Sequence, residues 1–272
     1  MLHFSKLRTV LLALAFSALG STAVQAETKV HWYGQSAFRI DTPSGGVILI
    51  DPWLKVPSNP DKESIEKLGR VDYILITHAH FDHVGNAIEI AKKTGAELIA
   101  TSDLARNLVA LEGYPKDKVK SGNVGGTIAL PKAGARATFV NAVHGSDLLL
   151  SKPAEGGPAL VAGGNPVGYV LEITDGPTIY HTGDTDLFTD MKLIPEFYKV
   201  DLMLSAAGGN FTMDPSRAAL AVEWVNPKQV IPMHWGTYPI LAGNPAQFKA
   251  ALDKRGLGNR MIEMKPGDDR SF

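Results

Sequence analysis

The sequence predicts an α/β protein in which mixed sheets form the interior and helices cover the outside. Two observations support this prediction: short apolar runs recur along the chain, and segments with helical patterns separate some of them. A third observation is that the chain has neither a fixed-period repeat nor a long linker. Residues 27–272 are therefore expected to form a single domain.

Short apolar segments are predicted to be strands. Many of them are continuous apolar runs, as expected for strands that are buried on both faces. The predicted strands are Val30–Tyr33, Phe38–Ile40, Val47–Ile50, Tyr73–Thr77, Leu98–Ala100, Ala137–Val143, Gly168–Ile173, Thr178–Tyr180, Leu202–Leu204 and Gln229–Ile231.

Helical patterns occur between these strands and after them. Asp214-Pro215 and Asn244-Pro245 each combine a capping residue with a proline that suits the first turn of a helix. The predicted helices are 86–93, 103–112, 214 to about 225, and 244 to about 256. Ser151–Pro166 is rich in Gly, Pro and Ala and is predicted to be a surface loop.

The composition excludes several classes of protein. The 272 residues include 27 basic and 28 acidic side chains, whereas a general nucleic-acid binder needs a basic excess. The chain has no cysteine, which removes disulfides, thiolate metal ligands and cysteine nucleophiles. A hydrophobic content of 44% is too high for a disordered chain.

The first 26 residues have the order of features of a secretory signal peptide. Lys6 and Arg8 precede an apolar stretch, Val10–Leu19, and Val24 and Ala26 place small residues at the −3 and −1 positions of a cleavage site. A membrane anchor needs roughly 20 apolar residues, about twice what this stretch offers. We therefore expect cleavage after Ala26, a periplasmic or secreted protein, and no stable membrane anchor after cleavage.

The most informative segment is Thr77-His-Ala-His-Phe-Asp-His-Val-Gly85. It places three imidazoles and one carboxylate within six residues, directly after a predicted buried strand and before a predicted helix. The four side chains are His78, His80, Asp82 and His83. Imidazole nitrogens and carboxylate oxygens together suit zinc, iron or manganese.

Three more candidate ligands follow other predicted strands, which a simple histidine-rich surface loop does not explain. They are His144, Asp184 and His234. Seven nitrogen and oxygen donors at four strand ends are more than one ion needs and about the number that suits two. We expect two divalent metal ions, zinc first, with manganese or iron also compatible with this ligand set.

The order of these residues resembles the metallo-β-lactamase superfamily. The motif His78-x-His80-x-Asp82-His83, then His144, Gly183-Asp184 and His234, follow one another as in that family, and the resemblance covers about residues 28 to 267. Segments that resemble a branch of metal-dependent hydrolases related to ascorbate-6-phosphate lactonases are Trp32–Phe38, Ile50–Trp53, Gly208–Asp214 and Ile231–His234. The resemblance implies a four-layer αβ/βα sandwich of two similar halves, with the metals on one edge of the sheets.

The resemblance also implies how the ligands divide between two ions. His78, His80 and His144 would hold one ion, Asp82, His83 and His234 the second, and Asp184 would bridge them. One position departs from the branch, which commonly has a histidine where this chain has Gln35. Glutamine can hydrogen-bond but cannot titrate near neutral pH, so an acid–base role at this position is in doubt.

Three polar residues near the ligands are candidates for supporting roles. Asp51 ends a predicted strand and is expected to accept an N–H from a ligand imidazole, the alternative being a turn carboxylate before Pro52. His181 precedes Asp184 by three residues and is either structural or supports a ligand. His31 alternates with aromatic neighbours and is expected to be a packed histidine.

Two aromatic residues beside His234 are expected to line a substrate pocket. They are Trp235 and Tyr238, and Tyr238 is also a candidate donor to a developing oxyanion. Asp82 is the candidate that orients the nucleophile and later returns a proton.

The expected function is that of an exported metal-dependent hydrolase. A metal-bridging hydroxide would attack a small ester, lactone or phosphoester. Two alternatives are a di-iron oxidoreductase on the same fold and a non-catalytic metal-binding envelope protein. The sequence names neither the substrate nor the oligomeric state.

Overall fold

The computed structural model describes residues 27–272, so the signal peptide expected in residues 1–26 lies outside the described residues. The strands are β1 (Lys29–Gly34), β2 (Ala37–Asp41), β3 (Val47–Ile50), β4 (Tyr73–Leu75), β5 (Glu97–Thr101), β6 (Val119–Gly122), β7 (Thr127–Leu130), β8 (Ala135–Asn141), β9 (Asp147–Leu149), β10 (Leu160–Ala162), β11 (Val167–Ile173), β12 (Thr178–His181), β13 (Leu202–Ala206), β14 (Gln229–Met233) and β15 (Asp269–Ser271). The α-helices are α1 (Phe81–Val84), α2 (Ala87–Thr94), α3 (Ser102–Leu111), α4 (Ile194–Phe197), α5 (Pro215–Val225) and α6 (Pro245–Asp253).

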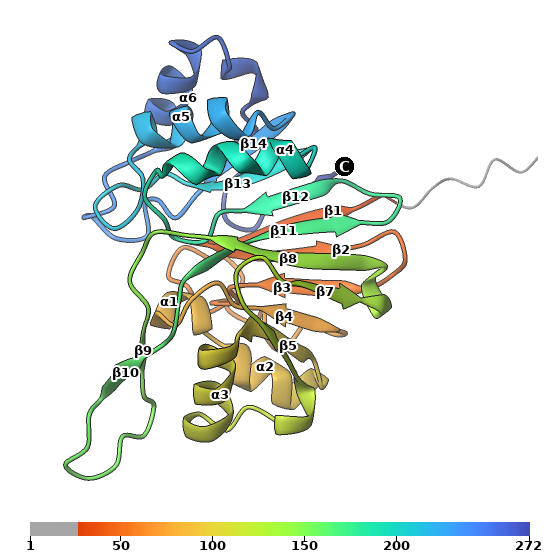
Figure 1. The fold of residues 1–272 in the computed structure, drawn as a ribbon, viewed down its shortest axis with the longest axis vertical. Coiled ribbons are helices and arrows are strands. Elements are labelled where there is room, and N and C mark those ends of the chain that lie inside the picture. The colour runs from red at the N-terminus through yellow and green to blue at the C-terminus, as the bar shows by residue number, and fades with distance from the viewer. Residues whose placement is uncertain (1–26) are drawn as a thin grey trace, which may run out of the picture.

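Two mixed sheets form the centre of the molecule (Figure 1). The first has seven strands in the order β15-β1-β2-β3-β4-β5-β6, and the second has six in the order β14-β13-β12-β11-β8-β7. In each sheet an antiparallel part continues into a parallel part, β3 to β6 in the first and β12 to β14 in the second. The two halves of the chain therefore build similar layers.

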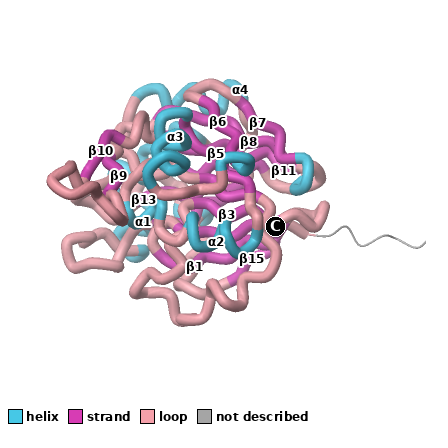
Figure 2. The backbone as a smooth tube through the Cα atoms, turned by 90° about the horizontal axis from the view of Figure 1, so that it is seen from below, coloured by secondary structure: helices cyan, strands magenta, loops and turns pink. Residues whose placement is uncertain are grey.

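Three buried clusters separate the layers. One lies between the two sheets, a second between the first sheet and helices α2 and α3, and a third between the second sheet and helices α4 to α6. Strand β3 supplies Ile48 and Ile50 to the first cluster and Leu49 to the second, so both of its faces are buried. The four-layer αβ/βα prediction is confirmed, and helices lie on both outer faces in Figure 1. Figure 2 shows α2 and α3 lying over the strands of the first sheet.

Helices α5 and α6 begin where the capping signals predict. The Asp214 side chain accepts hydrogen bonds from the backbone N–H groups of Ser216 and Arg217, and Asn244 accepts one from Gln247. Each cap satisfies backbone donors that the first turn leaves without partners. Helix α6 ends at Asp253, slightly before the predicted end.

Two strands that precede candidate ligands end two residues earlier than predicted, because the backbone there bonds to residues near the site. Strand β4 stops at Leu75, and Thr77 donates its backbone N–H to the Asp51 carboxylate (2.8 Å) instead of to a neighbouring strand. Strand β8 stops at Asn141, and Val143 bonds to Thr185 Oγ1 (3.0 Å) and to the Asp186 backbone. Side chains beyond these ends leave the sheets and turn toward one another.

The strands that the sequence did not predict are short. They are β6, β7, β9, β10 and β15, and most of their residues are exposed or half-buried. The prediction of a plain surface loop over Ser151–Pro166 is wrong in part, because β10 lies within it and pairs with β9 as a hairpin. None of the helices within residues 27–272 is long and apolar enough to cross a membrane.

Candidate metal centre

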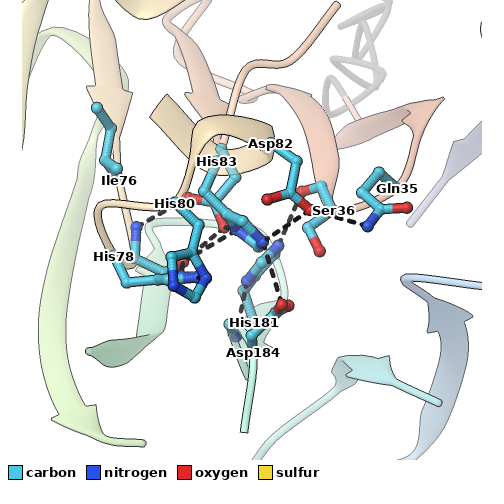
Figure 3. Close-up of polar contacts among 12 residues, drawn as sticks. Gln35, Ser36, Ile76, His78, His80, Asp82, His83, His181 and Asp184 are labelled. Carbon is cyan, nitrogen blue, oxygen red and sulfur yellow. Dashed lines mark hydrogen bonds and ion pairs between the residues drawn. The ribbon is translucent and has the colours of Figure 1, made fainter. Parts of the chain in front are cut away.

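All seven candidate ligands follow the carboxyl ends of strands at one edge of the two sheets. His78 and His80 lie between β4 and α1, and Asp82 and His83 are on α1 itself. His144 follows β8, Asp184 follows β12, and His234 directly follows β14. Figure 3 shows several of these side chains converging from separate segments. Ligand sites of layered α/β proteins occur at this end of the strands.

The donor atoms of the seven side chains are close enough to hold metal ions. Three overlapping groups have their donor atoms within 4.8 Å of one another: His78, His80 and His144; His78, His83 and Asp184; and Asp82, His83 and His234. Asp184 lies centrally, with Oδ2 at 2.8 Å from His234 Nε2, 3.3 Å from His83 Nε2 and 3.7 Å from His144 Nε2. The convergence expected from the sequence is present.

The Asp51 carboxylate holds the segment Thr77–His83 in place through two of its residues. Its Oδ2 lies 2.7 Å from His83 Nδ1, and the same carboxylate accepts the backbone N–H and the hydroxyl of Thr77. The His83 N–H that faces Asp51 fixes the ring so that Nε2 points to the other ligands. Asp51 has a φ of +46°, so the contact is held in a backbone conformation that is uncommon for residues other than glycine.

The hydrogen bonds also fix the protonation of His78. The Thr77 hydroxyl has one proton and donates it to Asp51 (2.7 Å), because a carboxylate can only accept. His78 Nδ1 lies 3.0 Å from the same hydroxyl oxygen and must therefore be the donor. The proton is then on Nδ1, and His78 Nε2 presents a lone pair to His80 Nδ1 (3.0 Å).

Two buried polar atoms of the cluster have no hydrogen-bond partner among the described residues. They are His83 Nε2 and Asp184 Oδ1. Leaving such groups unpaired costs free energy, so buried polar atoms without partners call for an explanation. The atoms that converge in this cluster are imidazole nitrogens and carboxylate oxygens, which are the donors that a divalent transition metal takes.

Without metal, burial and neighbouring charges shift the pKa values of the clustered histidines in different directions. Burial lowers the pKa of His80 and of His144, and burial together with His83 holds the pKa of His78 well below its usual range. Burial acts in the same direction on His234, but Asp184 outweighs it and raises the pKa to about 9. Asp184, despite its burial, has its pKa held well below its usual range by His234 and His83.

The Gln35–Ser36 turn connects three of the ligand-bearing segments. Gln35 Nε2 donates to Asp82 Oδ2 (2.9 Å), and the Gln35 carbonyl accepts the backbone N–H of His234 (3.0 Å). Both Gln35 and His234 have a positive φ, +49° and +58°. This departure from the family histidine thus places an amide donor, which cannot titrate, directly on the Asp82 carboxylate.

His181 belongs to the same connection and is structural rather than a partner of a ligand imidazole. Its Nδ1 accepts the backbone N–H of Gly183 (3.1 Å), so its Nε2 carries the proton and donates to the Ser36 carbonyl (3.1 Å). Burial lowers its pKa, which agrees with a neutral ring. His181 therefore holds the turn that carries Asp184 against the first half of the chain.

A cavity of about 260 Å³ opens over the ligands. Five of its lining residues are candidate ligands, His80, Asp82, His144, Asp184 and His234. The others are Gln35, Phe81, Phe211, Tyr238 and Leu241. Tyr238 lines the cavity as expected.

The expectation for Trp235 is wrong. Its ring is half-buried, lies 5.6 Å from the Trp32 ring and packs against the cluster between the sheets, while its indole N–H donates to the Pro232 carbonyl (3.0 Å). Phe81 and Phe211 line the cavity instead, and Phe81 could have been noticed because it lies inside the ligand motif. His31 is not fully packed either, since it is half-buried with Nδ1 at 2.9 Å from Asp269.

Comparison with known proteins agrees with this geometry. Residues 47–235 match the family described as the beta-lactamase superfamily domain. The chain belongs to the beta-lactamase superfamily. This match and the relatives described next identify the chain as a metal-dependent hydrolase.

Relatives in the beta-lactamase superfamily match almost the full length of the chain. A UPF0173 metal-dependent hydrolase of Thermodesulfovibrio yellowstonii is 48% identical over 89% of this chain and 91% of its own length. One from Anaeromyxobacter dehalogenans is 53% identical over 85% of this chain and 82% of its own. The structure of Igni18, a metallo hydrolase from Ignicoccus hospitalis, is 32% identical, covers 91% of this chain and 99% of its own, and has a TM-score of 0.78.

Proposed function

We propose that this chain is an exported hydrolase that holds two divalent metal ions, zinc first, and cleaves a small ester, lactone or phosphoester. The observation that carries the proposal is the convergence of five imidazoles and two carboxylates, of which His80, Asp82, His144, Asp184 and His234 line a cavity. Buried atoms without a hydrogen-bond partner are among them. His78, His80 and His144 would hold one ion, Asp82, His83 and His234 the other, and Asp184 would contact both.

The bound ions would supply a water of lowered pKa and polarise the substrate oxygen. The chain contributes the geometry. Asp51 keeps His83 Nε2 facing inward, and Gln35 holds the Asp82 carboxylate by one oxygen. The other Asp82 oxygen can then orient the nucleophile and take up or return its proton.

Tyr238 is proposed to stabilise charge that develops on the substrate oxygen. Its side chain lines the same cavity as the candidate ligands. Partial burial and the Asp82 charge raise the pKa of Tyr238 above its usual range, so the hydroxyl keeps its proton at neutral pH and can donate it.

The decisive experiment uses the protein that begins at Glu27, purified and analysed for metal. Chromogenic esters, lactones and phosphodiesters are then tested with and without chelator. Turnover that the chelator abolishes and that zinc restores supports the proposal. Bound iron with a redox signal supports the oxidoreductase alternative, and bound metal without turnover on any substrate supports the non-catalytic one.

Export has its own test. The full chain, expressed in a bacterial host, is expected in the periplasm or medium with a mass that corresponds to cleavage after Ala26. Recovery of the uncleaved chain in the cytosol or the membrane fraction would contradict this part of the proposal.

A further inference from the structure

The cavity over the metal centre has an aromatic rim, which we define as Phe81, Phe211 and Tyr238. These three side chains are 53%, 56% and 36% exposed. Exposed apolar side chains that gather at a cavity mark ligand-binding sites more often than scattered ones do. The aromatic rim is therefore a candidate surface for binding part of the substrate.

Trp53 holds two members of the rim in place. Its ring lies 5.5 Å from that of Phe81 in an edge-to-face arrangement and 6.4 Å from that of Tyr238 in a stacked one. Such pairs are stabilising beyond the area that they bury. Phe81 and Tyr238 are therefore in position before any ligand arrives, and little of their side-chain entropy is lost when a ligand binds.

The charges that line the cavity limit what can lie against this rim. Within the described part of the chain, each ionisable side chain of the lining other than Tyr238 is an imidazole or a carboxylate, and these belong to the proposed ligand set. The bound ions would act on the end of the substrate that lies over the ligands, whereas the far end would rest on Phe81, Phe211 and Tyr238, and the cavity lining contains no Lys or Arg among the described residues. Burying a charged group against these rings costs free energy that no side chain of the rim offsets.

We propose that the substrate is an uncharged ester or lactone whose aryl ring or short alkyl chain rests on the aromatic rim while its scissile bond lies over the metal ligands. This inference rests on the proposed hydrolysis, in which water cleaves the acyl C–O bond and yields an acid and an alcohol. The volume of about 260 Å³ fits a small molecule, since pockets for drug-sized ligands have about 300–1,000 Å³.

The test compares three aryl acetates on the zinc-loaded protein. They are phenyl acetate, its ring-carboxylated analogue and its ring-trimethylammonium analogue, and each kcat/KM is divided by the rate of hydroxide-catalysed hydrolysis in buffer. We expect phenyl acetate to exceed the carboxylated ester by about tenfold or more, because the latter buries a charge without a partner. Equal or faster cleavage of the carboxylated or the cationic ester would overturn the inference.

Variants test whether the preference for an aryl ester depends on the aromatic rim. Phe211→Ala should lower the ratio of kcat/KM for phenyl acetate to that for methyl acetate about fivefold, mainly by raising KM for the aryl ester. Phe197→Ala is the matched control, because Phe197 is 76% exposed on α4 and does not line the cavity. An unchanged ratio in Phe211→Ala would overturn the inference.

A binding measurement separates this inference from the proposed hydrolysis. Saturation-transfer NMR with phenol as the probe should show contact with the wild-type protein and with Phe197→Ala, and a weaker contact with Phe211→Ala. If no ester, lactone or phosphodiester is cleaved in a metal-dependent way, the proposed hydrolysis fails, whereas cleavage of phosphodiesters alone would overturn only the present inference. If esters are cleaved but phenol contacts all three proteins equally, the aromatic rim is not the binding surface.

Discussion

At the scale of single residues, Asp184 holds the cluster together. One of its carboxylate oxygens lies within 3.7 Å of ring nitrogens from three histidines, which are carried by α1, by the segment after β8 and by the end of β14. Few other side chains could serve all three, because a carboxylate offers several lone pairs on a short stem. The metal content of the protein should therefore depend on this residue.

Replacing Asp184 with alanine is expected to lower metal content and turnover together, with turnover falling at least about a hundredfold. Elemental analysis and chelator-sensitive hydrolysis measure the two quantities. Asp186→Ala is the control, since Asp186 is an exposed partner of Arg217 on the same loop. A variant that keeps both ions and full turnover would show that Asp184 does not bridge.

Gln35 is expected to act on turnover rather than on metal binding. Gln35→Leu keeps the approximate size of the side chain but removes the N–H that holds Asp82. Losing one hydrogen bond to a charged group costs about 1.5–3 kcal/mol, so kcat should fall about tenfold or more while metal content stays near that of the wild type. Gln247→Leu, on the surface of α6, is the control. A wild-type kcat in Gln35→Leu would contradict a positioning role.

At the scale of elements, the β9–β10 hairpin supports the loop that carries His78 and His80. Ser146 Oγ accepts the backbone N–H of Ala79 (3.2 Å), and a Cβ added at Gly163 would lie 2.1 Å from the Ala79 Cβ. The base of the hairpin thus has no room for a side chain at Gly163. The hairpin and the ligand loop form one packed unit.

Gly163→Ala is accordingly expected to displace the His78–His80 loop and to weaken metal binding about tenfold or more, with a smaller loss of thermal stability. Metal affinity by chelator competition and the midpoint of thermal unfolding measure the two effects. Gly156→Ala is the control at the tip of the same hairpin: an added Cβ meets nothing within 4 Å, and the strain expected from its φ of +70° is local to the tip. Equal metal affinity in both variants would contradict the coupling.

At the scale of the whole molecule, the buried charges set how stability depends on pH. In the metal-free protein the pKa of His234 is about 9, above its ordinary value of 6.5, so its protonation stabilises the fold fully below pH 6.5. That contribution is lost as the pH rises from about 6.5 to about 9. Burial would raise the pKa of Asp82, but His83 and His234 lower it to about 2, so its contribution is lost only as the pH falls below about 3.8.

Metal loading should reverse the slope between pH 6.5 and 9. Ions need unprotonated imidazoles, so their binding strengthens as the pH rises. The unfolding midpoint of chelator-treated protein is expected to fall by several degrees across this window, while that of zinc-loaded protein stays level or rises. Thermal unfolding of both forms in matched buffers measures this, and parallel curves would contradict the assignment of His234 as a ligand.

Much of the layered fold follows from local sequence patterns. Continuous apolar runs such as Val47–Ile50 predict strands buried on both faces, and the Asp214-Pro215 cap predicts the start of α5. The short strands were missed because they carry little apolar pattern of their own. In strand β15, for example, all three residues are exposed, and the strand exists through pairing with β1, which lies at the other end of the chain.

By itself, the sequence determined the chemical type of the site, because ligand side chains and the strands before them are local properties of the chain. The contacts that tune the site were decided only by the tertiary structure. Gln35 reaches Asp82 across 47 positions, and Phe211 and Tyr238 meet Phe81 at one cavity. The physical reason is that these contacts depend on how two sheets pack, which fixes distances between segments that share no local pattern.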